Sequence, residues 1–172
     1  CNAFVKFIRN FEDKESRHTL SCCNFTKEEM EKFSTLMEDE ITKKAVDYSI
    51  TISTEKEIDE INILQATFKA MRAAVSSLKI KPDMALVDGD KLPGLEIDSE
   101  AIVKGDSKST AIAAASILAK VSRDRLMLEM DEKYPEYCFA KHKGYGTKLH
   151  YEKLREFGPS EIHRLTFLKK MH

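Results

Sequence analysis

The chain has 172 residues, the length of one domain, and its 42% of hydrophobic residues can form a core without disulfides or a structural metal. Its formal net charge is -1 and 33% of its residues are charged, a composition that excludes collagen-like, low-complexity and disordered proteins. No apolar run approaches the roughly 20 residues of a membrane span, and the first residues lack the pattern of a signal peptide, so we expect no contact with a membrane.

The first half of the chain predicts two strands and two helices in turn. Residues 2–9 have the pattern of a short strand, and a capping box at Thr26 begins a helix with apolar residues at helical spacing. Residues 46–53 alternate between apolar and polar, as a half-buried strand does. A second capping box at Thr54 begins a long amphipathic helix over residues 55–78.

The second half continues this alternation of strands and helices. Residues 84–88 predict a buried strand, and residues 101–106 predict another. Residues 107–134 predict a long helix that can pack closely on a sheet, because its first half is small and apolar. A short helix follows Thr147 and ends at Gly158. This order predicts an α/β fold with a mixed or parallel sheet. We expect that one sheet to contain the strands 46–53, 84–88 and 101–106.

Charges and cysteines indicate the surroundings of the protein. Residues 27–60 contain five Lys or Arg and eleven Asp or Glu, a balance of -6, whereas residues 141–172 contain eight and three, a balance of +5. Such runs are commonly solvated surface, but a basic C-terminal segment also suits contact with a polyanion. Adjacent Cys22 and Cys23 lack the spacing of a metal knuckle or redox pair, so we expect reduced thiols in a cytoplasmic protein.

Two acidic residues follow predicted strands. Asp88 comes after one strand and Asp106 after another, and ligands gather at the carboxyl ends of strands in open α/β sheets. Two carboxylates without a His or Cys companion favour Mg²⁺ or Mn²⁺ over Zn²⁺. Both residues also fit structural roles, because Asp-Gly is common turn chemistry and Gly-Asp before a helix suits an N-cap.

Residues 141–147 combine two lysines, a histidine, an aromatic ring and two glycines in a predicted loop. An aromatic ring can stack on a base or sugar while lysines contact phosphates, although loops of this composition are also common without that function. The five histidines lack the spacing of a zinc site, and the sequence contains neither a nucleophile elbow nor a phosphate-binding P-loop.

Residues 102–127, with the sequence IVKGDSKSTAIAAASILAKVSRDRLM, closely resemble a segment of bacterial ribonuclease HII, the type 2 ribonuclease H. Three further segments match the same family in the same order: 57–71, 86–89 and 142–167. The resemblance covers about residues 26–172. We therefore expect a ribonuclease HII-like domain over residues 26–172, preceded by an atypical N-terminal segment over residues 1–25.

The resemblance implies a ribonuclease H-like mixed sheet flanked by helices, here without the usual first strands. It implies an endonuclease that cuts the RNA strand of RNA·DNA hybrids, and ribonucleotides embedded in DNA, with two Mg²⁺ or Mn²⁺ ions held by four carboxylates. Asp88 and Asp106 fall on the third and fourth of these carboxylates. Tyr145 falls on a tyrosine that stacks beside the cut, and we expect phosphate contacts from Lys143 and Arg164. We also expect a monomer.

The chain departs from the family at its N-terminus. The family's first two carboxylates lie in an Asp-Glu-x-Gly-Arg-Gly segment, whose backbone senses the ribose 2′-hydroxyl, and this segment does not occur here. Three hypotheses stay open: a truncated or altered ribonuclease HII, a catalytically impaired nucleic-acid-binding remnant, and a fragment that folds poorly. We predict little or no activity for the chain alone; if it is active, Glu12, Asp13 and Glu15 are the first candidates for the missing ligands.

Overall fold

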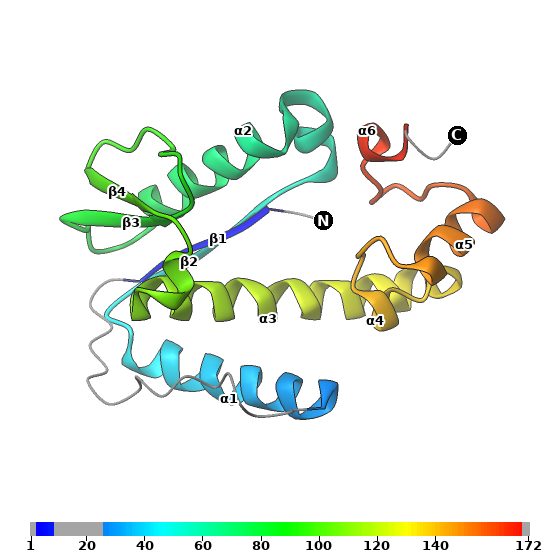
Figure 1. The fold of residues 1–172 in the computed structure, drawn as a ribbon, viewed down its shortest axis with the longest axis horizontal. Coiled ribbons are helices and arrows are strands. Elements are labelled where there is room, and N and C mark those ends of the chain that lie inside the picture. The colour runs from blue at the N-terminus through cyan, green and yellow to red at the C-terminus, as the bar shows by residue number, and fades with distance from the viewer. Residues whose placement is uncertain (1–2, 9–25, 170–172) are drawn as a thin grey trace.

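The computed structural model describes residues 3–8 and 26–169, which form an α/β fold (Figure 1). The strands are β1 (Ala3–Ile8), β2 (Tyr48–Ser53), β3 (Met84–Asp88) and β4 (Asp98–Ile102). The helices are α1 (Lys27–Lys44), α2 (Glu55–Ser76), α3 (Thr110–Lys133), α4 (Phe139–His142), α5 (Lys148–Phe157) and α6 (Leu165–Leu168). Short 3₁₀ turns occur at η2 (Gly105–Ser107) and η3 (Pro135–Tyr137). The predicted alternation of strands and helices is thus confirmed.

The strands form two separate pairs rather than one sheet. β1 pairs antiparallel with β2, with Ala3 opposite Ser53, and β3 pairs parallel with β4, with Asp88 opposite Ile102. Within the described residues, no ladder joins β2 to β3. The expectation that residues 46–53 share a sheet with the other two strands was therefore wrong, because β2 takes β1, the strand expected near the N-terminus, as its partner.

The segment between β4 and α3 turns earlier than the sequence indicated. The strand expected over residues 101–106 ends at Ile102, because Lys104 adopts a left-handed conformation with φ 56° and Gly105–Ser107 form a 3₁₀ turn. Neither conformation continues an extended strand. Ser109 then serves as the N-cap of α3, so this helix begins later than expected.

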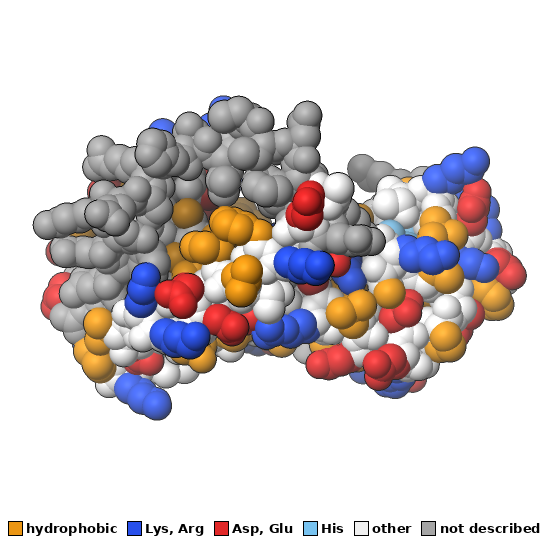
Figure 2. Space-filling view, turned by 90° about the horizontal axis from the view of Figure 1, so that it is seen from below, with side chains coloured by type: hydrophobic (Ala, Val, Ile, Leu, Met, Phe, Trp, Pro, Cys, Tyr) orange, Lys and Arg blue, Asp and Glu red, His pale blue; other side chains and the backbone are white. Residues whose placement is uncertain are grey.

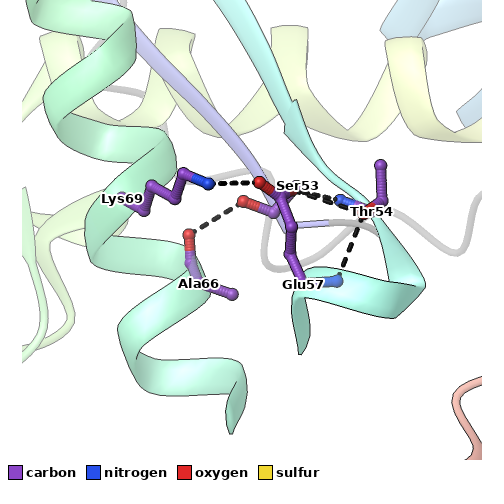
Figure 3. Close-up of polar contacts among 5 residues, drawn as sticks. All are labelled: Ser53, Thr54, Glu57, Ala66 and Lys69. Carbon is purple, nitrogen blue, oxygen red and sulfur yellow. Dashed lines mark hydrogen bonds and ion pairs between the residues drawn. The ribbon is translucent and has the colours of Figure 1, made fainter. Parts of the chain in front are cut away.

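Both predicted capping boxes are present, and Figure 3 shows the second. The Thr54 hydroxyl accepts the backbone N–H of Glu57 at 3.2 Å, and the Glu57 carboxylate accepts the N–H of Thr54 at 2.9 Å. Lys69 forms an ion pair with the same carboxylate, and the Ser53 hydroxyl donates to the Ala66 carbonyl at 2.9 Å. These contacts hold the end of β2 against the first turn of α2 and against residues 66–69 of the same helix.

α2 contains a break that the hydrophobic pattern does not reveal. Asn62 has φ 67° and ψ 164°, outside the helical region. Its side-chain oxygen accepts the backbone N–H groups of Leu64 and Gln65 at 3.0 and 3.1 Å, so Asn62 caps the second half of the helix. The helix also ends at Ser76 rather than at residue 78.

α3 is the central helix of the molecule. Figure 1 shows α1 on one side of it and the strands on the other, with β3 and β4 near its first turns and α4 and α5 at its far end. One buried cluster joins α1 to α3 and consists of Ile41, Ala114 and Leu118. A second holds together the C-terminal lobe, by which we mean residues 135–169, and consists of Tyr137, Phe139 and Leu154.

Candidate active site

Asp88 and Asp106 lie at the same edge of the β3–β4 pair. Asp88 is the last residue of β3, and Asp106 lies in the turn that follows β4. Because the two strands are parallel, their carboxyl ends meet at one edge. The backbone N–H of Gly105 donates to Asp88 Oδ1 at 2.8 Å, which fixes the Asp88 carboxylate one residue away from Asp106.

The turn at Gly105 passes close to two neighbouring side chains. A Cβ atom on Gly105 would lie 2.5 Å from Ile112 Cδ1 and 3.3 Å from Asp88 Oδ1. Both distances are shorter than normal contacts, so a side chain at position 105 would require Ile112 and the Asp88 carboxylate to shift. We expect such a shift to disturb the hydrogen bond from the Gly105 N–H to Asp88.

The two carboxylates fit a hard divalent cation. Both side chains are exposed, and Asp106 Oδ1 accepts the N–H of Ser107 at 2.9 Å. Among the described residues each carboxylate thus uses one oxygen, which leaves its second oxygen for a cation. Mg²⁺ binds through one or two carboxylates, with water and substrate phosphate completing its shell. Asp106 is not the N-cap of α3, since Ser109 has that position.

The described residues offer two candidate carboxylates for a divalent metal. In the ranges that the structure describes, no group of three His, Cys, Asp or Glu residues could hold a metal ion. Glu12, Asp13 and Glu15, the candidates for further ligands, lie outside the described residues. Asp88 and Asp106 are therefore the two candidate ligands among residues 3–8 and 26–169, and two carboxylates alone do not make a group of that size.

Tyr145, an exposed residue of the C-terminal lobe, pairs with Arg123 of α3. The Tyr145 side chain is 57% exposed, and the Arg123 guanidinium lies 4.3 Å from the centre of its ring. Arg123 also donates to the backbone carbonyl of Lys143 at 2.6 Å. A tyrosine held on one face by a cation and open on the other can stack on a nucleotide. Sequence reasoning missed Arg123, although it lies in the segment that resembles ribonuclease HII.

The position of Lys143 differs from the expected one. Lys143 is only 8% exposed and has a left-handed backbone with φ 49°. A side chain that contacts phosphate on a nucleic acid is expected to be accessible, so Lys143 fits this role poorly. Its backbone carbonyl instead accepts from Arg123 of α3, whose own side chain is 11% exposed and lies against the ring of Tyr145.

Arg164, the other expected phosphate contact, is half-buried and lies near Arg123. Its guanidinium is 3.8 Å from the ring centre of Phe167. Burial lowers the pKa of Arg164, the positive charge of Arg123 lowers it further, and Asp59 opposes both effects. Two guanidinium groups that repel each other are stabilised when an anion binds between or beside them. The pair is thus suited to phosphate.

Asp59 connects α2 to the end of the C-terminal lobe. Its carboxylate accepts the backbone N–H of Leu165 at 2.7 Å and that of Thr166 at 3.1 Å, and it accepts the Thr166 hydroxyl as well. Burial raises the pKa of Asp59, but these hydrogen bonds outweigh burial and lower it overall. Asp59 therefore holds the segment that carries Arg164 and Phe167.

The two groups of candidate residues lie at different places along α3. Arg123 follows the first residue of this helix by 13 positions, a rise of about 20 Å along the helix axis. No hydrogen bond or ion pair of the described residues joins Tyr145 to Asp88 or Asp106. A substrate that contacts both groups must extend along α3. On the face seen in Figure 2, several Lys and Arg side chains (blue) lie at the right-hand end, over the C-terminal lobe.

Comparison of sequences identifies the relatives of the chain. The sequence profile of the family Ribonuclease HII matches residues 23–171. Ribonuclease HII of Caldicellulosiruptor bescii is 57% identical over 133 residues, which cover 77% of this chain and 65% of that protein. Ribonuclease HII of Clostridioides difficile is 55% identical over 131 residues, 76% of this chain and 51% of that protein. The chain thus spans roughly half to two-thirds of the length of these relatives.

Solved structures agree with this relationship. The crystal structure of the ribonuclease H2 from Pyrococcus horikoshii OT3 has a TM-score of 0.67 and 28% identity, covering 83% of this chain and 74% of that chain. A chain of the PCNA:RNase HII complex from Archaeoglobus fulgidus has a TM-score of 0.62 and 20% identity, covering 87% and 77%, and supports the fold alone. None of the described helices is long and apolar enough to cross a membrane. The expected fold is confirmed, and the chain belongs to the ribonuclease HII family.

Proposed function

We propose that this chain carries part of the active site of an endonuclease that cuts the RNA strand of RNA·DNA hybrids and ribonucleotides embedded in DNA. The observation that carries the proposal is the hydrogen bond from the Gly105 N–H to Asp88, which brings the Asp88 and Asp106 carboxylates to one edge of the parallel strands. Membership of the ribonuclease HII family supports the same function.

Divalent ions, Mg²⁺ or Mn²⁺, are the cofactors that the donor set fits, as both available ligands are exposed carboxylates. When bound, such ions stabilise the charge on the entering and leaving oxygens of a phosphodiester. The residues of the chain have simpler roles. Asp88 and Asp106 attract and hold the cations, and the Gly105 N–H keeps Asp88 in the orientation that this requires.

The substrate contacts that we propose lie on the C-terminal lobe. The exposed face of Tyr145 stacks on a nucleotide, while Arg123 holds the opposite face of the ring. Arg164 contacts a phosphate beside Tyr145. This contact is favourable because an anion relieves the electrostatic repulsion between Arg164 and Arg123. A nucleic-acid duplex can reach both this pair and the carboxylates by lying along α3.

A second function, that of a catalytically impaired nucleic-acid-binding protein, is favoured by one observation. The described residues supply two carboxylates to the metal site and contain no group of three possible ligands. Two-metal chemistry needs more negative charge than two carboxylates provide. Under this alternative the chain binds hybrids through Tyr145 and Arg164 but does not cut them.

The organisation and location of the chain belong to the same proposal. We propose a ribonuclease HII-like domain over residues 26–172, supported by a family match over residues 23–171, and an atypical segment over residues 1–25. The pairing of β1 with β2 ties part of that segment to the domain. A cytoplasmic monomer with reduced thiols is consistent with Cys138, which is a free cysteine.

Cleavage of a duplex that carries a single ribonucleotide, in Mg²⁺ and in Mn²⁺, tests the proposal. We expect little or no cleavage by the chain alone. Replacing residues 1–25 by the family's Asp-Glu-x-Gly-Arg-Gly strand and the Asp-Ser-Lys-Lys-Leu element that follows it should restore cleavage, and Asp88→Asn should abolish it again. Asp98→Asn is the matched control, because it removes an exposed carboxylate from the opposite end of β4.

The outcomes separate the two functions. A grafted protein that binds the duplex but does not cut it supports the impaired alternative. EDTA-sensitive cutting by the unmodified chain, lost on Asp88→Asn, shows that residues outside the described ranges complete the site. Equal cutting by the grafted protein with and without Asp88→Asn contradicts the proposed metal site.

A further inference from the structure

Three buried histidines lie beneath the loop that carries Tyr145 and take no part in the carboxylate site. His142 belongs to α4, His150 to α5, and His163 to the segment before α6. All three are buried in the C-terminal lobe. On the face that Figure 2 shows, histidine (pale blue) reaches the surface only at a small spot.

The hydrogen bonds of His163 and His150 form a chain with one direction. His163 Nδ1 lies 2.9 Å from the backbone nitrogen of Ser160 and 2.7 Å from the Ser160 hydroxyl. The hydroxyl can donate or accept, but the N–H can only donate, so Nδ1 is an acceptor and neutral His163 carries its proton on Nε2. His163 Nε2 lies 3.0 Å from His150 Nε2, which must then accept. His150 therefore carries its proton on Nδ1, 2.9 Å from the carbonyl of Tyr145. We call this chain from Ser160 to Tyr145 the histidine relay.

His142 supports the relay from one side. Its ring stacks on that of His150, with centres 4.3 Å apart and an interplanar angle of 16°. The N–H of Gly144 donates to His142 Nδ1 at 3.2 Å, so the proton lies on Nε2, which donates to the Tyr137 carbonyl at 2.9 Å. His142 and His163 thus share one tautomer, and His150 has the other.

The relay works only while its histidines are neutral. A second proton on His163 would face the Ser160 N–H, beside the Ser160 hydroxyl, and a second proton on His150 would face the His163 N–H. Burial, together with the nearby His150 and His142, lowers the pKa of His163 to about 4, although the hydrogen bond from Ser160 opposes this. Burial also lowers the pKa of His150, although its hydrogen bond to Tyr145 opposes this. The other groups in ring contact are Tyr137, Phe139 and Tyr151.

We infer that His150 is a positioning residue for Tyr145, held in its Nδ1-protonated form by His163. The Tyr145 carbonyl accepts from His150 and also from the Thr147 N–H at 2.8 Å, and the Tyr145 N–H donates to the His142 carbonyl at 2.8 Å. The backbone on both sides of the ring is thereby fixed to the buried histidines. The expected effect on nucleic-acid binding rests on the proposed function of Tyr145. The assignment of the histidine tautomers does not depend on that function.

Long-range ¹⁵N–¹H NMR of the unmodified chain shows which ring nitrogen of each histidine carries the proton. We expect the Nδ1-protonated form for His150 and the Nε2-protonated form for His142 and His163. We also expect no titration of His163 between pH 6 and 8, and a pKa of His150 below its ordinary value. An Nε2-protonated His150, or titration of either residue near pH 6.5, would overturn the relay. Asp88→Asn should leave the spectrum unchanged, so a failed nuclease proposal does not affect this result.

Two substitutions then test the positioning role, because the amide of Asn replaces Nδ1 of histidine and the amide of Gln replaces Nε2. His150→Asn keeps a donor for the Tyr145 carbonyl, whereas His150→Gln does not. We expect His150→Gln to weaken binding of a duplex with one ribonucleotide by about tenfold, and His150→Asn to retain affinity within about threefold. The assay omits divalent metal, so that the carboxylates take no part.

Folding is controlled by comparing the two variants with each other. His163→Gln, which keeps a donor toward His150, serves as a further variant and should bind within about threefold of the unchanged chain. Equal losses for His150→Asn and His150→Gln, or unchanged binding in both, would overturn the positioning role. If the unchanged chain binds weakly and Tyr145→Ala does not weaken binding further, the proposed role of Tyr145 is contradicted. The assignment of the tautomers is not affected by that result.

Discussion

The carboxylate edge and the C-terminal lobe differ in how fully their polar atoms are used. Asp88 and Asp106 are exposed, and each accepts one backbone N–H among the described residues. In the C-terminal lobe, both ring nitrogens of His150 and of His163 are engaged in hydrogen bonds. An exposed carboxylate can keep an oxygen free at little cost, whereas a buried unpaired nitrogen costs about 1–3 kcal/mol. Free carboxylate oxygens suit a site that receives a ligand. Fully hydrogen-bonded histidines suit a scaffold that holds a substrate-contacting residue in place.

The largest expected effect comes from Gly105→Ala, which disturbs the carboxylate edge. The new Cβ would lie 2.5 Å from Ile112 Cδ1 and 3.3 Å from Asp88 Oδ1. We expect the grafted, active protein to lose at least about 100-fold in cleavage, because Asp88 is displaced. Urea unfolding should show a loss of about 1–3 kcal/mol.

A second substitution shows whether this loss is steric. Ile112→Val removes the Cδ1 atom that the new Cβ meets first, so it should recover part of the stability lost in Gly105→Ala. A double variant that is less stable than the sum of the two single changes would contradict the contact. Unchanged cleavage in Gly105→Ala would show that Asp88 does not depend on the Gly105 N–H.

Tyr145→Ala tests the proposed substrate contact of the C-terminal lobe. We expect binding of a duplex that carries one ribonucleotide to weaken by roughly 1–3 kcal/mol, the value of one base stacked on an aromatic ring. Tyr145→Phe keeps the ring and should bind as the unchanged chain does. Fluorescence anisotropy measures both affinities. Equal affinities for Tyr145→Ala and Tyr145→Phe would remove Tyr145 from the substrate contact.

Acid should weaken the C-terminal lobe through His163. The pKa of this histidine is about 4 in the folded chain and about 6.5 when unfolded, so below pH 6.5 the unfolded chain binds the additional proton. The stabilisation is complete above pH 6.5 and is lost as the pH falls toward 4. We expect the free energy of unfolding to be about 2 kcal/mol lower at pH 5 than at pH 7.5, by urea denaturation.

His163→Gln should lose most of this difference, because the amide does not titrate. Asp47, Glu57 and Asp59 also have lowered pKa values, but carboxylates with ordinary values of 3.8 or 4.5 lose their contributions below this pH interval. Equal stability of the unchanged chain at the two pH values would mean that His163 is not buried in neutral form.

Features set by neighbouring residues could be predicted from the sequence. The caps at Thr26, Thr54 and Thr147 each depend on a side chain and an N–H three residues later, and all three are present. The placement of Asp88 and Asp106 at one edge follows from parallel strands, a rule that requires no long-range detail. The break at Asn62 could not be predicted, because it preserves the spacing of apolar residues and so leaves the helical pattern intact.

Features that depend on distant segments could not be predicted. The pairing of β1 with β2 joins residues 40 to 50 positions apart, and nothing in either strand specifies it. The sequence shows only that the histidines lack the spacing of a metal site. The contact between His150 and His163 could not be predicted, because it forms when the lobe folds back on itself. Arg123 likewise reaches Tyr145 across two elements, and Lys143 is buried by the same packing.

Binding of Mn²⁺ to the unmodified chain, followed by electron paramagnetic resonance, tests the central claim most directly. Asp88 and Asp106 should hold one ion weakly, and Asp88→Asn or Asp106→Asn should abolish this binding while Asp98→Asn preserves it. The measurement requires neither substrate nor a complete active site. The same Mn²⁺ affinity in all three variants and in the unchanged chain would contradict the assignment of Asp88 and Asp106 as metal ligands.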